Sequence, residues 1–439
     1  MTARSEQSAN ARRVLILTAE VGDGHLSAAR TLAADIASQE PGCEVVIADA
    51  LEGLGPVLRF MLLDSYRWQL RWAPWIFGCL YAVFGRFAPL RGVGRAGLAL
   101  LGSRSMRRLM LRHDADVVVS TYPAAASVLG SLRRRGLLSL PVYATVTDLG
   151  GLAFWAHPGV DLHLVMHEAC VTEVERLAGP GSARRVRPLV DATFFQPCDA
   201  GPIRSRLGVT GDQVLVIVSG GGWGVGDLAG AAETALTRAD AFVVCLAGRD
   251  EQLRRRLEQR FAGEQRVLVL GFTDEMNELL SAADVLVHST GGVTSLEALV
   301  RGCPVIAYGS PPGHAPLLSR TIAALGLGED ARSPAELKAS LQRIHVRQQR
   351  GPSLLDPAPP AALLIVAAGA NELRTRSDSG RKRIAAVAAL LAALLLGGWT
   401  LASDDGYRVW ASPVQRTGSQ WICASNHSYQ ARTAGCARV

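Results

Sequence analysis

The sequence lacks the cysteine and histidine spacing that binds structural metal ions. Its 439 residues include eight cysteines, and no two of them form a CxxC pair. Six of the eight are therefore expected to be reduced thiols of an intracellular body, and we assign no metal site. Residues 1–13 are polar and lack the apolar core of a signal peptide, so secretion by that route is not predicted.

Excess positive charge is scarce in most of the chain, although the formal net charge is +7. Residues 373–439 hold nine Lys/Arg and three Asp/Glu, so they account for +6, and residues 1–372 account for only +1. The high overall basicity therefore gives no argument for a nucleic-acid partner. Residues 59–112 are the exception, with ten arginines and one aspartate.

Aromatic residues make up only 6% of the chain, yet many gather in the predicted insertion at residues 55–112. Pro74 is expected to divide this insertion into two short helices. Aromatic anchors beside arginines are typical of a segment that contacts an anionic membrane surface. Core packing of a helical insertion, and binding of single-stranded nucleic acid, are the alternatives. We expect acceptor or membrane contacts from Trp68, Trp72, Trp75 and Tyr81.

The stretch 271–315 contains two continuous apolar runs, which favour strands of a parallel sheet covered on both faces. Gly291 and Gly292 lie between the run Val285–His288 and a helix that begins near Thr294. Backbone N–H groups and the helix dipole converge at such a turn, so it can hold an anion such as a diphosphate. Glu297 has two interpretations: it completes a capping box with Thr294, or it accepts hydrogen bonds from a ribose.

A second glycine turn lies near the beginning of the chain. The strand Val14–Thr18 runs through Gly22 and Gly24 into a helix from about His25 to Gln39. A dinucleotide site is one interpretation, but Ser27 stands at its third glycine position. The alternative is that His25 faces the crevice above the sheet and contacts a ligand.

Asp148 ends another buried strand, where ligands collect in open α/β sheets. An acid there, near the helix that begins at His25, is suited to act with it as a general base. Capping of the following turn is the alternative for Asp148. Trp155 and His157 are expected in the loop that follows, on the acceptor side.

Residues 187–195 are expected to form a hinge, after which a second βαβ series begins. It contains the strand 214–219 and a third glycine turn at Gly220, Gly221 and Gly222. The sequence therefore predicts two doubly wound halves whose glycine turns face one another. A cleft of this kind, with a membrane patch on one side, is typical of transfer from a nucleotide-activated donor to a lipid.

Several motifs resemble those of one enzyme family in their order and spacing over residues 13–345. They are ValGlyAspGlyHisLeuSerAlaAla, ValThrAsp ending at Asp148, Trp155-Ala-His157, GlyGlyGlyTrpGly, GlyPheThrAspGluMet, and Gly291 to Glu297-Ala-Leu. The chain resembles the monogalactosyldiacylglycerol synthase and processive diacylglycerol glycosyltransferase family, relatives of the lipid-linked N-acetylglucosaminyltransferase of peptidoglycan synthesis. The resemblance implies a GT-B fold, a UDP-sugar donor, a lipid acceptor and no metal cofactor.

The resemblance also implies roles for individual residues. Asp148 would deprotonate the acceptor hydroxyl, and His25 would position the acceptor or the diphosphate. The C-terminal domain would hold the donor: phosphates at Gly220, Gly221, Gly222, Gly291 and Gly292, uracil at Phe272 and Thr273, ribose at Glu297, with Thr294 and His314 beside them.

Two positions depart from the family pattern. Val293 stands where glycine is usual, which would narrow the diphosphate turn. His314-Ala315 replaces a polar pair that contacts the hexose, and an alanine cannot bind a hydroxyl group. The identity of the sugar is therefore not predicted.

The end of the chain is expected to leave the globular body. Residues 359–371 are predicted to form a helix that crosses back to the first domain. Residues 384–402 carry no charge over nineteen positions, which favours a transmembrane helix over a buried one, and the basic cluster before them predicts a cytoplasmic body. Residues 403–439 would then lie outside, where Cys423 and Cys436 could form a disulfide.

These observations predict four parts: an acceptor domain (1–187) containing the insertion, a donor domain (188–372), a basic linker with a membrane helix (373–402), and a tail (403–439). We expect an inverting, metal-independent transferase that passes a hexose from a UDP-sugar to diacylglycerol or a similar lipid. A polyprenyl-linked or other glycolipid acceptor is one alternative. A non-catalytic lipid-binding membrane protein is another.

Overall fold

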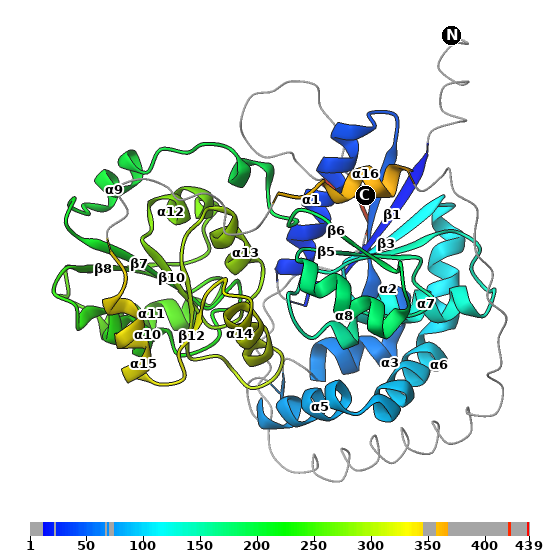
Figure 1. Cartoon of the computed structure of the whole chain (residues 1–439), viewed down its shortest axis with the longest axis horizontal. Helices are drawn as coiled ribbons and strands as arrows, with labels where there is room; N and C mark the ends of the chain where they lie inside the picture. Colours follow the sequence, from blue (N-terminus) through cyan, green and yellow to red (C-terminus); the bar gives the residue numbers. More distant parts are fainter. Residues whose placement is uncertain are drawn as a thin grey trace.

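The computed structural model describes residues 12–21, 23–65, 68–69, 74–345 and 357–367, and two short strands at 420–422 and 437–438. Two α/β domains lie side by side, with the N-terminal one in blue and cyan and the C-terminal one in green and yellow (Figure 1). Each contains one sheet covered by helices. This arrangement confirms the predicted pair of Rossmann-like domains, with parallel sheets at their centres.

The N-terminal sheet has the strand order β14-β13-β2-β1-β3-β4-β5-β6. Its strands are β1 (Arg13–Thr18), β2 (Glu44–Asp49), β3 (Val117–Ser120), β4 (Val142–Thr145), β5 (Leu162–Val165), β6 (Ala183–Arg185), β13 (Gln420–Ile422) and β14 (Ala437–Arg438). The strands from β2 to β6 pair in parallel, with Leu15 opposite Val46 and Val118. Apolar residues on both faces of β1 and β3 are buried, as the continuous apolar runs predict.

The C-terminal sheet has the order β12-β11-β10-β7-β8-β9, and its strand pairs are parallel. Its strands are β7 (Val214–Ser219), β8 (Ala241–Leu246), β9 (Val267–Leu270), β10 (Val285–His288), β11 (Val305–Ala307) and β12 (Glu329–Asp330). The order changes direction at β7 and β10. The turns after those two strands therefore lie at the switch point of the sheet, where ligands bind in this class of fold.

Helices connect the strands and cover the sheets. In chain order they are α1 (Gly24–Gln39), α2 (Ala50–Leu54), α3 (Pro56–Arg59), η2 (Phe60–Asp64), α5 (Pro74–Arg86), α6 (Ala88–His113), α7 (Pro123–Arg134), η3 (Leu152–Phe154), α8 (Glu168–Ala178), η4 (Ala192–Phe195), α9 (Gly201–Leu207), α10 (Leu228–Leu236), α11 (Glu251–Arg260), α12 (Met276–Ala282), α13 (Val293–Val300), α14 (Ala315–Ala324), α15 (Pro334–Gln342) and α16 (Ala361–Ala367).

The insertion contains longer helices than the sequence predicts. Pro74, predicted to divide two helices, is the first residue of α5, a position that proline prefers. After Phe87, α6 continues for 26 residues. A Cβ atom at Gly78 of α5 would lie 3.3 Å from the Cβ atom of Pro312, so this helix also contacts the C-terminal domain.

The chain returns to the first domain after α15, as predicted. The backbone N–H of Arg187 donates to the carbonyl oxygen of Pro359 at 2.9 Å, and α16 buries Ala361, Ala362 and Ile365 in the core beneath α1. The closing helix therefore joins the two domains at a second point.

Among the described residues, no helix combines the length and apolar composition needed to span a bilayer. The predicted span at 384–402, the linker and the cysteines Cys423 and Cys436 lie outside those residues. The strand β13 pairs antiparallel with β2 at the edge of the N-terminal sheet. This placement differs from the predicted position of residues 403–439 across a membrane.

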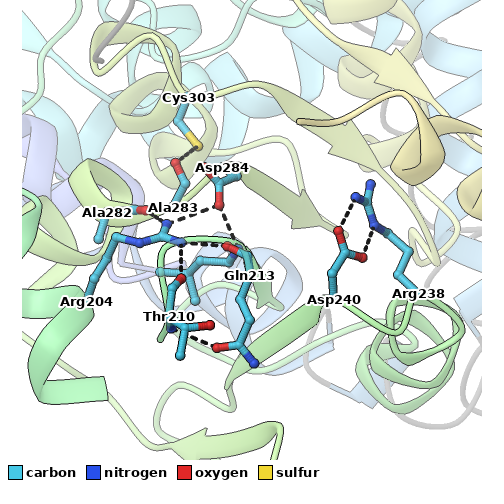
Figure 2. Close-up of polar contacts among 10 residues, drawn as sticks. Arg204, Thr210, Gln213, Arg238, Asp240, Ala282, Ala283, Asp284 and Cys303 are labelled. Atoms are coloured by element: carbon cyan, nitrogen blue, oxygen red, sulfur yellow. Dashed lines mark hydrogen bonds and ion pairs between the residues drawn. The ribbon is translucent and has the colours of Figure 1, made fainter. Parts of the chain in front are cut away.

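The C-terminal domain is stabilised by a buried ion pair between Arg204 and Asp284 (Figure 2). The guanidinium group of Arg204 donates to the Asp284 carboxylate at 3.1 Å and to the carbonyl oxygens of Ala282 and Gln213. The same carboxylate oxygen accepts the N–H of Leu215 at 2.7 Å. Because Asp284 is fully buried, this set of donors is needed to stabilise its charge, and it connects α9 to β7.

Candidate functional site

A cavity of about 300 Å³ lies between the two domains, which is large enough to hold a small-molecule ligand. The N-terminal domain contributes Asp23, His25 and Asp148 to its lining, among others. The C-terminal domain contributes residues from three of the predicted donor motifs: Gly220, Gly221, Gly222, Phe272, Thr273, Gly292, Thr294, Glu297 and His314. Asp148 and Glu297, predicted on opposite halves, therefore open onto one common space.

Asp148 lies just beyond β4, at the carboxyl end of the strand. One of its carboxylate oxygens, Oδ2, accepts a hydrogen bond of 2.9 Å from the indole Nε1 of Trp155. The indole is buried, with 1% of its surface exposed. Trp155 was predicted to contact an acceptor or a membrane, but the structure places it behind Asp148 in the protein interior.

His25 lies in the first turn of α1, as predicted. Its ring packs between Tyr122 and Trp155, with ring centroids 5.4 Å and 6.1 Å away. Its Nδ1 lies 3.4 Å from the Thr147 hydroxyl oxygen. Burial lowers the pKa of His25, while the negative charge of Asp148 opposes that shift. His25 is therefore a neutral imidazole at neutral pH, able to donate or accept a hydrogen bond beside Asp148.

The turn after β7 approaches the N-terminal domain very closely. A Cβ atom at Gly222 would lie 1.8 Å from Oδ2 of Asp23, so glycine leaves the room that this carboxylate occupies. Gly221 has a φ of +69°, which also favours glycine. Both residues line the cavity, so exposed backbone, rather than side chains, forms this part of its wall.

The turn between β10 and α13 differs from the predicted capping box. Gly292 is the N-cap of α13, no side chain caps the helix, and Thr294 lies inside its first turn. Gly291 has a φ of +68° and donates its N–H to Nδ1 of His288 at 2.8 Å, but it is not part of the cavity lining. The capping interpretation of Glu297 is therefore wrong.

Glu297 lies one turn into α13 and faces the cavity. Burial, together with the charge of Asp191, raises the pKa of Glu297 to about 7. No ion pair of the described residues includes Glu297. Its carboxylate is therefore available to accept hydrogen bonds from hydroxyl groups of a ligand.

Val293 fills part of the space beside the glycine turn, as the sequence predicts. Its Cγ2 would lie 3.1 Å from a Cβ atom at Gly24, so the first turns of α13 and α1 pack against each other. This contact joins the two domains at the inner end of the cavity.

Phe272 and Thr273 line the outer part of the cavity. The guanidinium group of Arg249 covers the Phe272 ring, 3.6 Å from its centroid. The Thr273 hydroxyl oxygen accepts the N–H of Glu275 at 3.1 Å. The predicted uracil site therefore includes one aromatic ring, which an arginine of the same domain covers.

His314 and Ala315 lie at the beginning of α14, and both line the cavity. Burial lowers the pKa of His314, and the nearby charge of Asp148 opposes that shift. The departure from the family pair therefore brings a second neutral imidazole toward Asp148. Ala315 is buried and presents only a methyl group.

His157 was predicted to lie on the acceptor side, and the structure corrects this prediction. Its Nδ1 accepts the N–H of Gly159 at 3.0 Å, and its Nε2 lies 3.2 Å from the Ser131 hydroxyl. Burial and nearby arginines lower the pKa of His157 to about 3. Both nitrogens are thus satisfied inside the domain core, so His157 is a structural residue rather than an acceptor contact.

The insertion presents large apolar side chains to solvent. Trp75 is 65% exposed and Phe60 is 62% exposed, and Trp68 is also exposed. Tyr81 lies in α5, and Trp72 lies outside the described residues. These exposed aromatic rings are the observation on which the membrane contact proposed below rests.

Sequence reasoning missed four residues of the site. Asp23 and Arg249 form an ion pair of 3.4 Å between the domains, although 226 positions separate them. Thr147 contacts His25, and its position next to Asp148 in the sequence could have identified it as a site residue. His288 shapes the Gly291 turn from the end of β10, and nothing in the sequence distinguishes it from a buried strand residue.

Each domain matches the model of a different protein family. Residues 25–180 match the model for monogalactosyldiacylglycerol (MGDG) synthase, and residues 215–345 match the model for glycosyl transferases group 1. A processive diacylglycerol beta-glucosyltransferase of Bacillus licheniformis is 23% identical over 312 residues, covering 69% of this chain and 79% of the relative. Its counterpart in Bacillus cereus is 26% identical over 360 residues, covering 75% and 86%.

A solved structure shares the fold. The crystal structure of Os79 from O. sativa in complex with UDP covers 75% of this chain and 90% of its own, with a TM-score of 0.50 and 15% identity. At this identity the likeness concerns the fold alone, and it agrees with a GT-B architecture.

Proposed function

We propose that this chain is a glycosyltransferase that passes a hexose from a UDP-sugar to diacylglycerol or a similar membrane lipid. The match of residues 25–180 to the monogalactosyldiacylglycerol synthase model, the match of residues 215–345 to the glycosyl transferases group 1 model and the similarity to processive diacylglycerol beta-glucosyltransferases support this proposal. The observation that carries the proposal is the shared cavity. An acid from one domain and a glycine-lined anion site from the other face the same space.

In the proposed reaction, Asp148 takes the proton of the acceptor hydroxyl, and the acceptor oxygen attacks the anomeric carbon. The bond from that carbon to the UDP oxygen breaks as the new bond forms, so the configuration inverts. Backbone N–H groups at the turns after β7 and β10 stabilise the charge that develops on the leaving diphosphate. This arrangement is expected to work without a divalent metal ion.

The donor is proposed to bind mainly to the C-terminal domain. Glu297 accepts hydrogen bonds from the ribose, and Phe272 and Thr273 contact the uracil. Thr294 and His314 lie where the diphosphate and the hexose would meet, since both line the cavity between Glu297 and Asp148. Because Ala315 offers only a methyl group, fewer hexose hydroxyls are fixed than in a site with two polar side chains.

The acceptor is proposed to enter from an anionic membrane surface along the insertion. The exposed rings of Phe60, Trp68 and Trp75 support this side of the proposal, because aromatic rings favour the interfacial region of a bilayer. We propose that the catalytic domains act at the cytoplasmic face of the cell membrane. Residues 384–402 are a proposed second attachment, which truncation before residue 384 would test through loss of membrane recovery.

The experiment is an assay of the full chain with mixed lipid vesicles and one radiolabelled UDP-sugar at a time. A labelled, chloroform-soluble product from one donor, insensitive to EDTA, is the expected result. Added diacylglycerol should increase the amount of product. If only polyprenyl phosphate or a preformed glycolipid increased it, that lipid would be the acceptor instead of diacylglycerol. No product from any donor would contradict the proposal and favour a lipid-binding protein without transfer activity.

A further inference from the structure

A partly buried arginine of the insertion contacts the backbone beside the proposed base. Arg95 lies in α6, and its Nη2 donates to the carbonyl oxygen of Ala153 at 3.0 Å and to that of Ala156. Burial and the nearby positive charges of Arg91 and Arg134 lower the pKa of Arg95 to about 10. Among the described residues, the ion pairs of this structure do not include Arg95, so its charge is stabilised by backbone carbonyls instead.

The two carbonyl groups flank Trp155 on either side in the chain. The indole of Trp155 is enclosed, and its single donor, Nε1, is committed to Oδ2 of Asp148 at 2.9 Å. Because packing around the enclosed indole restricts its rotation about χ1 and χ2, its position follows the backbone of the loop that carries it. Arg95 therefore fixes the segment from which the hydrogen bond to Asp148 is made.

The insertion also contacts this loop through α5. A Cβ atom at Gly85 would lie 3.5 Å from the Phe154 ring, and Nη1 of Arg91 donates to the carbonyl oxygen of Gly85 at 2.7 Å, which ties α5 to α6. Phe154 immediately precedes Trp155. The two helices of the insertion thus hold the loop from two directions.

We propose that Arg95 is a positioning residue for the transfer reaction, acting through Trp155 to aim the Asp148 carboxylate. The inference rests on the proposed function and goes beyond it, because it assigns the insertion a part in catalysis in addition to its membrane surface. Trp155 occupies Oδ2, so Oδ1 remains directed to the acceptor hydroxyl. A base must be held in a narrow range of geometry, and a fixed donor on one oxygen achieves this.

The test compares Arg95→Met, Trp155→Phe and the double variant in the full chain with vesicles. Each single variant is expected to lower kcat by about tenfold, because the hydrogen bond that orients the charged Asp148 carboxylate is weakened or lost. Because Arg95 is proposed to act only through the Trp155–Asp148 hydrogen bond, the double variant should lose about tenfold rather than about a hundredfold. The Kd for UDP should stay within about twofold throughout.

Arg95→Lys is the conservative variant. A lysine keeps the charge but lacks the planar group that reaches two carbonyls, so kcat should recover part of the loss seen with methionine. Arg204→Met is the matched control, since Arg204 also donates to backbone carbonyls but lies away from the cavity lining. It should lower the melting temperature without changing kcat of the folded enzyme. Multiplicative losses, or a UDP Kd that weakens in step with kcat, would overturn the proposal.

A readout independent of activity separates this inference from the proposed function. In protein labelled with ¹⁵N-tryptophan, the indole N–H signal of Trp155 is identified by its loss in Trp155→Phe. Arg95→Met and Asp148→Asn should both move that signal, whether or not the wild-type protein transfers a sugar. An unmoved signal in Arg95→Met would refute the positioning role, while an inactive wild-type protein would refute only the proposed function.

Discussion

The Asp23 carboxylate and the Arg249 guanidinium group come from different domains and lie 3.4 Å apart at the cavity between them. Asp23 also lies against the backbone of Gly222, where a Cβ atom would lie 1.8 Å from the Asp23 carboxylate oxygen Oδ2. Arg249 covers the Phe272 ring and donates its backbone N–H to the carbonyl oxygen of Gly222. A negative charge beside a proposed diphosphate site is thus balanced by a cation from the donor domain.

Arg249→Met should weaken UDP binding by about fivefold, because the Asp23 charge is then left facing the diphosphate. Asp23→Asn in the same chain should restore the affinity, since it removes that charge. Titration calorimetry with UDP at two salt concentrations checks both variants, and the loss should shrink at 0.5 M NaCl.

Arg260→Met is the control for this pair. Arg260 forms a similar surface ion pair with Glu233 in the same domain, and Glu233 does not line the cavity, whereas Asp23, the partner of Arg249, does. It should leave UDP affinity unchanged. If the double variant bound UDP as weakly as Arg249→Met, repulsion by Asp23 would not be the cause.

Most of the central strands of both sheets were predictable because each is a continuous apolar run, whereas β6 and β12 consist largely of charged residues and were not predicted. The run 285–288 and the turn after it illustrate this, since β10 has the predicted bounds. The helix start did not follow the local rule: α13 begins at Val293, because its first turn packs on Gly24 of the other domain. A tertiary contact here outweighs the side-chain cap that the sequence offers.

The roles of side chains were predictable only at strand ends and helix starts, because in this class of fold those positions face the crevice. Asp148 and His25 lie at a strand end and a helix start that must face the crevice, and both reach the cavity. His157 and Trp155 were placed by motif alone, and the core encloses both. The pairing of Asp23 with Arg249 depends on how the domains close, which no local pattern encodes.

Asp148→Asn should lower kcat by about 10³-fold while leaving the Kd for UDP nearly unchanged, because an amide cannot take the acceptor proton. Matched rate measurements and UDP titrations check this. The control is Asp49→Asn: Asp49 also ends a strand of the same sheet, but it caps α2 and pairs with Arg59. Near-normal turnover of Asp148→Asn would remove Asp148 as the base.

Trp75→Ser and Phe60→Ser should each weaken binding to anionic lipid vesicles by about tenfold, since a buried aromatic side chain contributes about 1.5–3 kcal/mol. Cosedimentation with vesicles measures the change. Leu363→Ser is the control, because Leu363 is similarly exposed but lies on α16, at the opposite end of the domain from α5 (Figure 1). Equal losses in all three variants would argue against a membrane surface on the insertion.

Glu297 should make stability fall as the pH rises. Its pKa in the folded protein is about 7, above the ordinary 4.5, so the folded state binds more protons than the unfolded state between those values. The free energy of unfolding therefore declines from about pH 4.5 to pH 7, and the full loss is present above pH 7. Glu297→Gln removes this penalty and should stabilise the protein by about 2 kcal/mol at pH 8, with little effect at pH 4.5.

The same substitution should weaken ligand binding, because the ionised carboxylate is the better acceptor for ribose hydroxyls. Uridine is the suitable probe, since it carries the ribose without a phosphate group that titrates in this range. Wild-type affinity for uridine should rise as the pH increases through about 7, whereas Glu297→Gln should bind about tenfold more weakly at pH 8 and show no such rise. Thermal unfolding and uridine titrations at pH 5, 6, 7 and 8 measure both effects. If Glu297→Gln were more stable at pH 8 yet bound uridine like the wild type, the effect of the buried charge on stability would be confirmed. Glu297 would then not belong to the ribose site.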